Sequence, residues 1–203
     1  TKGAQTGNLL HDILEHVDFS EPNWPQAFKW PLAKYSQEEI QEEKLQAWFE
    51  EILHTPLHCN SVLSDIKLQK TLRESEFYFP MNTSNSVELT QMLSNHRAVG
   101  KSAADYQSVH LPGYKKLKGM MHGFIDLIFE HEGKYYVCDY KSNYLGYTFE
   151  EYSAEAMREN IEKHFYDLQY LIYSLALHRQ LQFLIPDYCV ETHFGGVYYF
   201  YLR

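Results

Sequence analysis

Two aspartates and a lysine fall on neighbouring extended segments, with a spacing that would let them share one face of a β-hairpin. Asp126 ends the run Gly-Phe-Ile-Asp, while Asp139 and Lys141 belong to the run Val-Cys-Asp-Tyr-Lys. A turn centred on Glu132-Gly133, midway between these runs, would place Asp126 directly opposite Asp139. Side chains directly opposite on paired strands lie roughly 4.5–5.5 Å apart at Cβ. Because side chains alternate with period two along a strand, Lys141 would share the face of Asp139.

The chemistry that this arrangement favours is the binding of a divalent cation. Like charges that face each other on a sheet are destabilising, and a single lysine cannot fully compensate two buried carboxylates. A metal ion held by carboxylate oxygens would compensate both. The alternative is a structural salt bridge in which Lys141 pairs with one aspartate, and the residues alone leave both interpretations open.

Length and composition limit the class of protein. The 203 residues are enough for one substantial domain, and we expect residues 1–203 to form one. Cys59, Cys138 and Cys189 are odd in number and far apart, which suits a reducing cytoplasm better than a disulfide framework. No run approaches the roughly 18 apolar residues of a membrane-spanning helix, so we expect a cytoplasmic protein without a membrane partner.

The net charge of −9 argues against an autonomous binder of nucleic acid, which would normally be basic. DNA delivered by a partner is still compatible with this charge. Lys115, Lys116 and Lys118, just before the expected hairpin, are a local exception. They could be a solvated loop or a phosphate contact.

Hydrophobic periodicity gives an outline of the fold. Apolar residues at helical spacing predict a first helix from Thr6 to Val17. Ser36-Gln-Glu-Glu39 is typical of a capping box and predicts a helix to about His54, whereas three prolines make residues 22–31 look irregular. Further helices are expected over residues 61–72, 86–97, 149–163 and 165–181, strands over residues 74–80 and 196–202, and the hairpin over residues 120–141. This pattern predicts an α/β fold with a small central mixed sheet flanked by helices.

Other polar residues have weaker signals. His11 follows Gly7 by one helical turn and lies at the edge of an apolar arc, where a histidine is more often a hydrogen-bonded boundary residue than a metal ligand. Gly7 lacks a side chain and would let another backbone or a ligand approach His11. Gln169 and Tyr173, also one turn apart, could be an ordinary polar helix face. Glu76 could be a solvent-facing strand residue.

Together these pieces form a recognisable series. The motifs Gly7-x-x-x-His11, Gly123-x-x-Asp126, Asp139-Tyr-Lys141 and Gln169-x-x-x-Tyr173, in this order, resemble the RecB-type branch of the PD-(D/E)XK nucleases. The resemblance runs from about Gly7 to Arg203 and is strongest beyond Gly119. Each motif alone is weak, but the combination is specific. The implied fold is a restriction-endonuclease-like core.

The resemblance implies a role for each motif residue. Asp126 and Asp139 would hold Mg²⁺ (or Mn²⁺ as a substitute), helped by the backbone carbonyl of Tyr140 and by a nitrogen of His11. Lys141 would orient or deprotonate the attacking water. The remaining motif residues, Gln169 and Tyr173, would line the site, and Glu76 would occupy an auxiliary acidic position.

The resemblance also implies a biological setting. The chain would be the C-terminal nuclease domain of a larger ATP-driven helicase–nuclease that acts on double-strand DNA ends in recombinational repair. It would receive single strands from the unwound duplex, with RecC-like and RecD-like subunits and a RecA-type protein as partners. No nucleotide-binding loop of the Gly-x-x-x-x-Gly-Lys-Ser/Thr type occurs in the 203 residues, so the motor is expected elsewhere. The rival hypothesis is a non-catalytic docking module for RecA-type or RecC-type partners.

Overall fold

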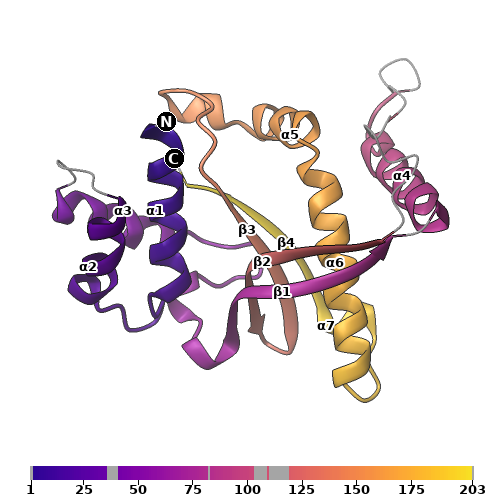
Figure 1. The fold of residues 1–203 in the computed structure, drawn as a ribbon, viewed down its shortest axis with the longest axis horizontal. Helices are drawn as coiled ribbons and strands as arrows, with labels where there is room; N and C mark the ends of the chain where they lie inside the picture. The colour runs from indigo at the N-terminus through magenta and orange to yellow at the C-terminus, as the bar shows by residue number, and fades with distance from the viewer. Residues whose placement is uncertain (1, 36–40, 82, 103–108, 110–118, 203) are drawn as a thin grey trace. The chain divides into compact units, whose positions relative to one another are not determined.

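The computed structural model describes residues 2–35, 41–81, 83–102, 109 and 119–202 (Figure 1). The chain divides into two compact units. The first unit contains residues 1–75, 124–144 and 181–203, and the second contains residues 76–123 and 145–180. Each unit has its own hydrophobic core. The expectation of one domain over residues 1–203 stays a prediction. Among the described residues we find no helix with the length and apolar character that a membrane span requires.

The first helix of the first unit, α1 (Lys2–His16), confirms the prediction from periodicity. Leu9, Leu10, Ile13 and Leu14 have no exposed surface, and they belong to the same core cluster as the hairpin residue Leu127. The apolar stripe of α1 therefore anchors the helix that carries His11.

The expected irregular stretch over residues 22–31 is wrong, because residues 24–35 form α2 (Trp24–Tyr35) with Pro31 inside the helix. An internal proline costs about 3 kcal/mol. Trp24, Phe28 and Pro31 recur on one helical face and are all buried. The Trp24 and Phe28 rings pack 5.7 and 6.1 Å from the ring of Phe49 on α3 (Glu42–His54). Burial of this face offsets the cost of the proline. The predicted capping box, residues 36–39, lies outside the described residues, as do Lys115, Lys116 and Lys118.

The helix expected over residues 61–72 is also wrong. Two single 3₁₀ turns, η1 (Leu63–Asp65) and η2 (Leu68–Lys70), occupy this stretch, and strand β1 (Thr71–Met81) follows directly. Leu63 and Ile66 are buried three residues apart. One 3₁₀ turn satisfies that spacing as well as an α-helix does, so periodicity could not distinguish the two.

The central mixed sheet is confirmed. Its four strands lie in the order β1, β2 (Gly119–His131), β3 (Lys134–Lys141) and β4 (Phe194–Tyr201). β2 and β3 form the predicted antiparallel hairpin, and β4 runs parallel to β3. The chain is therefore an α/β protein with a four-strand mixed sheet flanked by helices.

The hairpin has the predicted register. Leu127 pairs with Cys138, the register in which Asp126 faces Asp139 one position further along. Leu127 and Cys138 have no exposed surface and belong to the core cluster that also contains the α1 leucines. Because side chains alternate along a strand, Asp126 and Asp139 point to the opposite face of the hairpin from Leu127 and Cys138.

The turn explains why this register is fixed. Glu132 and Gly133 have φ values of 50° and 79°, so both central residues lie in the left-handed region. A two-residue type I′ turn requires this conformation, and its twist matches that of the flanking strands.

Helices α4 (Thr83–Ala98) and α6 (Tyr166–Leu184) confirm the helices expected over residues 86–97 and 165–181. The single helix expected over residues 149–163 is wrong in its first part, because the 3₁₀ turn η4 (Phe149–Tyr152) ends at Ser153, whose side chain caps the start of α5 (Ala154–Lys163). The short α7 (Val190–His193) was not predicted. Within the second unit, Leu93 of α4 packs with Leu168 and Ile172 of α6 in a small core.

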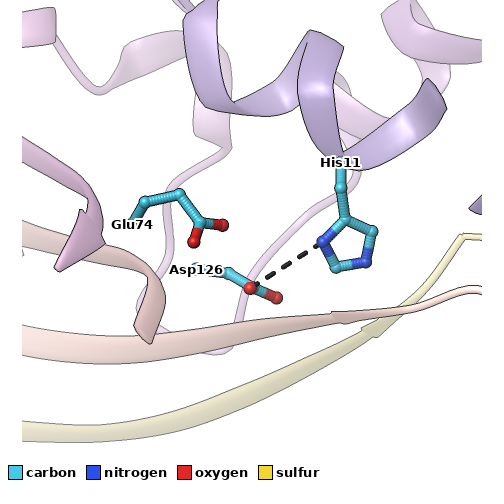
Figure 2. Close-up of side chains that lie close together, drawn as sticks. All are labelled: His11, Glu74 and Asp126. Carbon is cyan, nitrogen blue, oxygen red and sulfur yellow. Dashed lines mark ion pairs between the residues drawn. The ribbon is translucent and has the colours of Figure 1, made fainter. Parts of the chain in front are cut away.

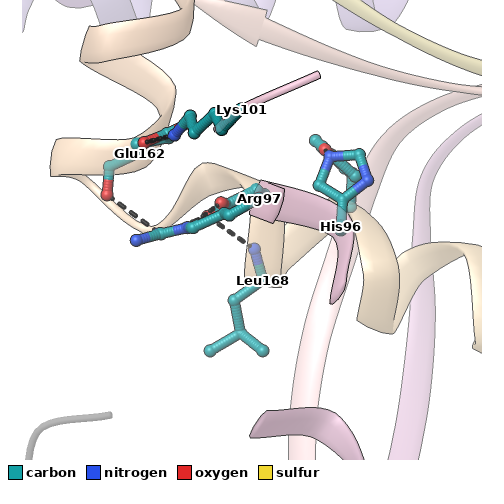
Figure 3. Close-up of polar contacts among 7 residues, drawn as sticks. His96, Arg97, Lys101, Glu162 and Leu168 are labelled. Atoms are coloured by element: carbon teal, nitrogen blue, oxygen red, sulfur yellow. Dashed lines mark hydrogen bonds and ion pairs between the residues drawn. The ribbon is translucent and has the colours of Figure 1, made fainter. Parts of the chain in front are cut away.

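A buried ion pair reinforces that core (Figure 3). Arg97 of α4 donates from both Nε and Nη2 to the Asp167 carboxylate of α6, and Nη2 also donates to the carbonyl of Glu162 at 3.0 Å. Asp167 is only 1% exposed, so Arg97 compensates a charge that water cannot reach. Lys101 pairs with the Glu162 side chain at 2.7 Å, and this pair is more exposed.

Arg97→Met tests this role of the ion pair. The variant leaves the Asp167 carboxylate buried without its guanidinium, so we expect the free energy of unfolding to fall by about 3–5 kcal/mol. Urea unfolding followed by circular dichroism measures the loss. Lys101→Met, which removes the more exposed pair, should cost less than about 1 kcal/mol. Equal losses in the two variants would contradict the role assigned to Arg97.

Candidate metal centre

Three side chains from three elements of the first unit come together at one point (Figure 2). His11 projects from α1, Glu74 from β1 and Asp126 from β2, and one ligand atom of each lies within 4.8 Å of the others. Nδ1 of His11 is 3.8 Å from Oδ1 of Asp126. An imidazole nitrogen and carboxylate oxygens at this separation form a donor set that suits a divalent metal ion.

Tyr140 orients two members of this cluster. Its backbone N–H donates to Oδ2 of Asp126 at 2.8 Å, which leaves Oδ1 directed toward His11. The buried Tyr140 ring meets the imidazole of His11 edge-on, with centroids 5.7 Å apart. The polypeptide thus fixes both side chains before any ligand binds. The part of the Tyr140 carbonyl in metal binding stays a prediction.

The salt bridge considered as the alternative to a metal is present between Lys141 and Asp139, but the Lys141 charge does not keep the pKa of Asp126 from rising. Nζ of Lys141 lies 2.6 Å from Oδ2 of Asp139, and the two residues are 8% and 4% exposed. Asp126 and Glu74 lie in the cluster with His11 instead. The lysine therefore leaves negative charge at the centre to be balanced by another cation.

The pKa directions show the same imbalance. Burial, followed by repulsion from Asp139, raises the pKa of Asp126 to about 7. Burial, followed by the Asp126 charge, raises the pKa of Glu74, and burial also raises that of Asp139 despite the attraction of Lys141. Burial lowers the pKa of His11, which favours the neutral imidazole that binds metals. Half-buried and buried carboxylates that raise one another's pKa beside a neutral imidazole fit a divalent cation.

The acidic residue in this cluster is Glu74, and not Glu76 as the resemblance implied. Glu76 belongs to the second unit, where it bonds with Tyr78 and His122. Strand alternation alone would put Glu74 and Glu76 on the same face. Glu74 has a φ of 48°, in the left-handed region, so the alternation is broken at this residue. The sequence pattern could not predict this change in alternation, because a left-handed backbone conformation is uncommon for a residue other than glycine.

Arg73, which the sequence did not single out, fixes the strand next to Glu74. Its Nη1 donates to the carbonyls of Leu14 and Val17 at 2.6 and 3.2 Å, and its guanidinium stacks 3.7 Å from the ring centroid of Phe19. These carbonyls end α1, where partial negative charge favours a cation. Arg73 thus joins the helix that carries His11 to the strand that carries Glu74.

Gly7 permits a close approach, but to a side chain rather than a backbone. A Cβ at Gly7 would lie 2.5 Å from Oγ of Ser142, the residue that follows Lys141. Any larger residue at position 7 would push α1 away from the end of β3. The absence of a side chain at Gly7 therefore helps to hold His11 near the hairpin.

Gln169 and Tyr173 lie in the second unit. Nε2 of Gln169 donates to the Tyr173 hydroxyl at 2.7 Å, and the Tyr173 ring meets Phe77 of β1 edge-on at 5.2 Å. They form a pre-ordered polar pair on α6. Their part in the site stays a prediction.

Comparison with known proteins decides the family. The model of the PD-(D/E)XK nuclease superfamily matches residues 1–202. The chain belongs to this superfamily. It is 38% identical over 203 residues to the RecBCD enzyme subunit RecB of Escherichia coli and 36% identical over 209 residues to that of Haemophilus influenzae. The RecB subunit of Mycolicibacterium smegmatis is 28% identical over 223 residues.

These matches cover all or nearly all of the chain but only 17%, 16% and 21% of the three RecB subunits. The chain therefore corresponds to about a sixth to a fifth of these relatives. Within that part it is a RecB-like PD-(D/E)XK nuclease domain with a candidate acidic metal site.

The raised pKa of Asp126 predicts an unusual pH dependence of the metal-free protein. Between its ordinary value of 3.8 and about 7, the folded state holds a proton that the unfolded state has released. The free energy of unfolding should therefore fall as the pH rises through this range. Asp126→Asn cannot ionise, so it should match the wild type near pH 4 and exceed it by about 2–4 kcal/mol at pH 8.

Urea unfolding in EDTA at several pH values measures this difference. Asp65→Asn, at an exposed carboxyl, controls for the loss of an acidic group. Parallel pH profiles for the wild type and Asp126→Asn would contradict the electrostatic description of the centre.

Proposed function

We propose that this chain is a Mg²⁺-dependent DNA nuclease that hydrolyses phosphodiester bonds at the centre formed by His11, Glu74 and Asp126. Mn²⁺ would be a suitable substitute. The observation that carries the proposal is the pair of half-buried carboxylates, Glu74 and Asp126, around a neutral imidazole, next to the buried Asp139–Lys141 ion pair. Membership of a nuclease superfamily supports the same chemistry.

The metal would be held by Asp126 and Asp139, by His11 and by the carbonyl of Tyr140, with Glu74 as an additional acidic group. When bound, it would polarise a phosphoryl oxygen and stabilise the charge that develops there. The hydrogen bond from the Tyr140 N–H keeps Asp126 in the orientation that this task needs.

Lys141 would act on the attacking water, which it would orient or deprotonate. Its Nζ is held by Asp139 at 2.6 Å and lies 5.1 Å from the ring centroid of Tyr199, so it is already positioned. Gln169 and Tyr173, which are hydrogen-bonded to each other, would contact DNA or support the catalytic groups.

The relatives support a proposal for the wider role of the domain. Because the matched proteins are RecB subunits of RecBCD enzymes, we place this chain in a RecBCD-like helicase–nuclease of the exodeoxyribonuclease V type, which repairs double-strand ends by recombination. Its DNA would be single strands from an unwound duplex. Its partners would be RecC-like and RecD-like subunits and a RecA-type protein, in the cytoplasm.

A non-catalytic docking module is the competing function. The net charge of −9 favours it, since acidic surfaces bind basic partners. A docking module has no need to bury Asp126, Glu74 and Asp139 together, where each raises the free energy of the folded state. This cost favours a catalytic centre.

Asp126→Ala tests the nuclease itself. Loss of this carboxylate should lower Mg²⁺-dependent cleavage of single-stranded DNA at least about 100-fold, because the several kcal/mol that a metal contributes are lost. Gel assays with 5′-labelled oligonucleotides measure the rate, and Asp65→Ala serves as the matched control. Equal rates in the wild type and Asp126→Ala would refute a catalytic role for this centre.

Lys141→Arg tests whether Lys141 is the general base. Arginine keeps the positive charge near Asp139 but cannot be deprotonated in a protein. We expect cleavage to slow by about 10²–10⁴-fold, the usual contribution of a general base, with Mn²⁺ affinity measured by calorimetry changed little. A variant that cleaves at nearly the wild-type rate would exclude proton transfer by Lys141 and leave it an electrostatic role.

A further inference from the structure

Two aromatic side chains lie stacked on the exposed face of β1 and β2 in the second unit. The rings of Tyr78 and His122 are 4.8 Å apart at their centroids and inclined by only 16°. Tyr78 is 60% exposed, and the side chain of His122 is 44% exposed. Tyrosine and histidine are intermediate in their tendency to be buried, and here the two exposed rings stack on each other.

Glu76 holds both rings in place. Its Oε1 accepts a hydrogen bond from the Tyr78 hydroxyl at 2.9 Å and lies 2.6 Å from Nε2 of His122. One carboxylate thus orients two side chains from neighbouring strands before any ligand arrives. This is the structural role of the glutamate that the resemblance had placed near the metal.

The opposite face of the same strands is already filled by other side chains, so it has no room for these rings. Phe77 packs there against Tyr173, and Met121 packs against the small core of the second unit. Gly123 lies under the Phe77 ring, where a Cβ would come within 2.7 Å of it. Because this side is filled, alternation keeps Tyr78 and His122 on the surface.

We propose that Tyr78 and His122 form a stacking platform for the bases of single-stranded DNA. Flat aromatic faces bind bases with little sequence preference, because every base has a π-face. A carboxylate beside the rings disfavours phosphate contact, so the bases rather than the backbone would meet this surface. The inference rests on the proposed nuclease function and adds a substrate-binding surface to it.

The covalent chain sets an upper limit to the distance between the platform and Asp126 of the metal centre. His122 and Asp126 are four residues apart on the single strand β2, and four residues span at most about 14 Å. A strand of DNA that is cut at Asp126 therefore has bases within reach of the platform. This proximity favours DNA over a protein partner as the occupant.

The experiment measures fluorescence anisotropy of a labelled oligothymidylate titrated with the 203-residue chain in EDTA, so that no strand is cut. Tyr78→Ala should weaken binding about 5- to 100-fold, the usual effect of losing one stacked base. Tyr78→Phe, which keeps the ring, should bind within about threefold of the wild type. Phe183→Ala removes an aromatic ring that is 89% exposed elsewhere, and it should change nothing.

An oligomer of abasic residues separates stacking from every other explanation. It should bind the wild type and Tyr78→Ala equally, because it has no base to stack. Unchanged oligothymidylate affinity in Tyr78→Ala, or equal weakening for the abasic oligomer, would overturn the platform.

A failure of the proposed function looks different. In that case Asp126→Ala and the wild type would cleave DNA equally, whatever Tyr78→Ala does to binding. Thermal unfolding checks that each variant is folded, and substitutions at these exposed positions should leave the midpoint within about 3 °C.

Discussion

Mutual repulsion among Asp126, Asp139 and Glu74 is the interaction on which the rest of this structure depends. Each carboxylate is removed from much of the solvent, which raises the pKa of all three. The Asp139 charge further raises the pKa of Asp126 and of Glu74, and the Asp126 charge raises that of Glu74. Lys141 pairs directly with Asp139. Its charge also favours ionisation of Asp126, but burial and the Asp139 charge outweigh this effect and raise the pKa of Asp126 to about 7. A fold that keeps these groups together must stabilise the arrangement elsewhere.

That stabilisation comes from the elements around the centre. The α1 leucines and the hairpin residues Leu127 and Phe129 are fully buried in one core, which supplies much of the favourable free energy of folding. Arg73 ties the end of α1 to β1, and the Tyr140 N–H holds Asp126. Rigid support of this kind keeps acidic ligands close together despite their repulsion.

Much of this could be predicted from the sequence because it depends on short-range geometry. The Glu132-Gly133 turn and period-two alternation determine the hairpin register, and that register brings Asp126 opposite Asp139. Amphipathic spacing likewise identified α1. In each case, local chain geometry and the burial of apolar residues favour the same structure.

The failures have a common physical cause, which is that tertiary contacts override local preference. Burial of Trp24 and Phe28 sustains a helix through Pro31, and a left-handed backbone at Glu74 turns its carboxylate toward His11. His11 itself gave an ambiguous pattern, because the two carboxylates that lie beside it belong to β1 and β2, more than 60 residues away.

Anomalous X-ray scattering from crystals soaked in Mn²⁺ is the most direct measurement of the central claim. The account predicts one strong peak between Asp126 and Asp139, within coordination distance of His11 or Glu74, at about 2.0–2.3 Å from the carboxylate oxygens. The same soak of Asp126→Ala crystals should give no peak at this position. Wild-type crystals saturated with Mn²⁺ that show no density there, with Asp126 and Asp139 unmoved, would contradict the assignment of this cluster as a metal centre.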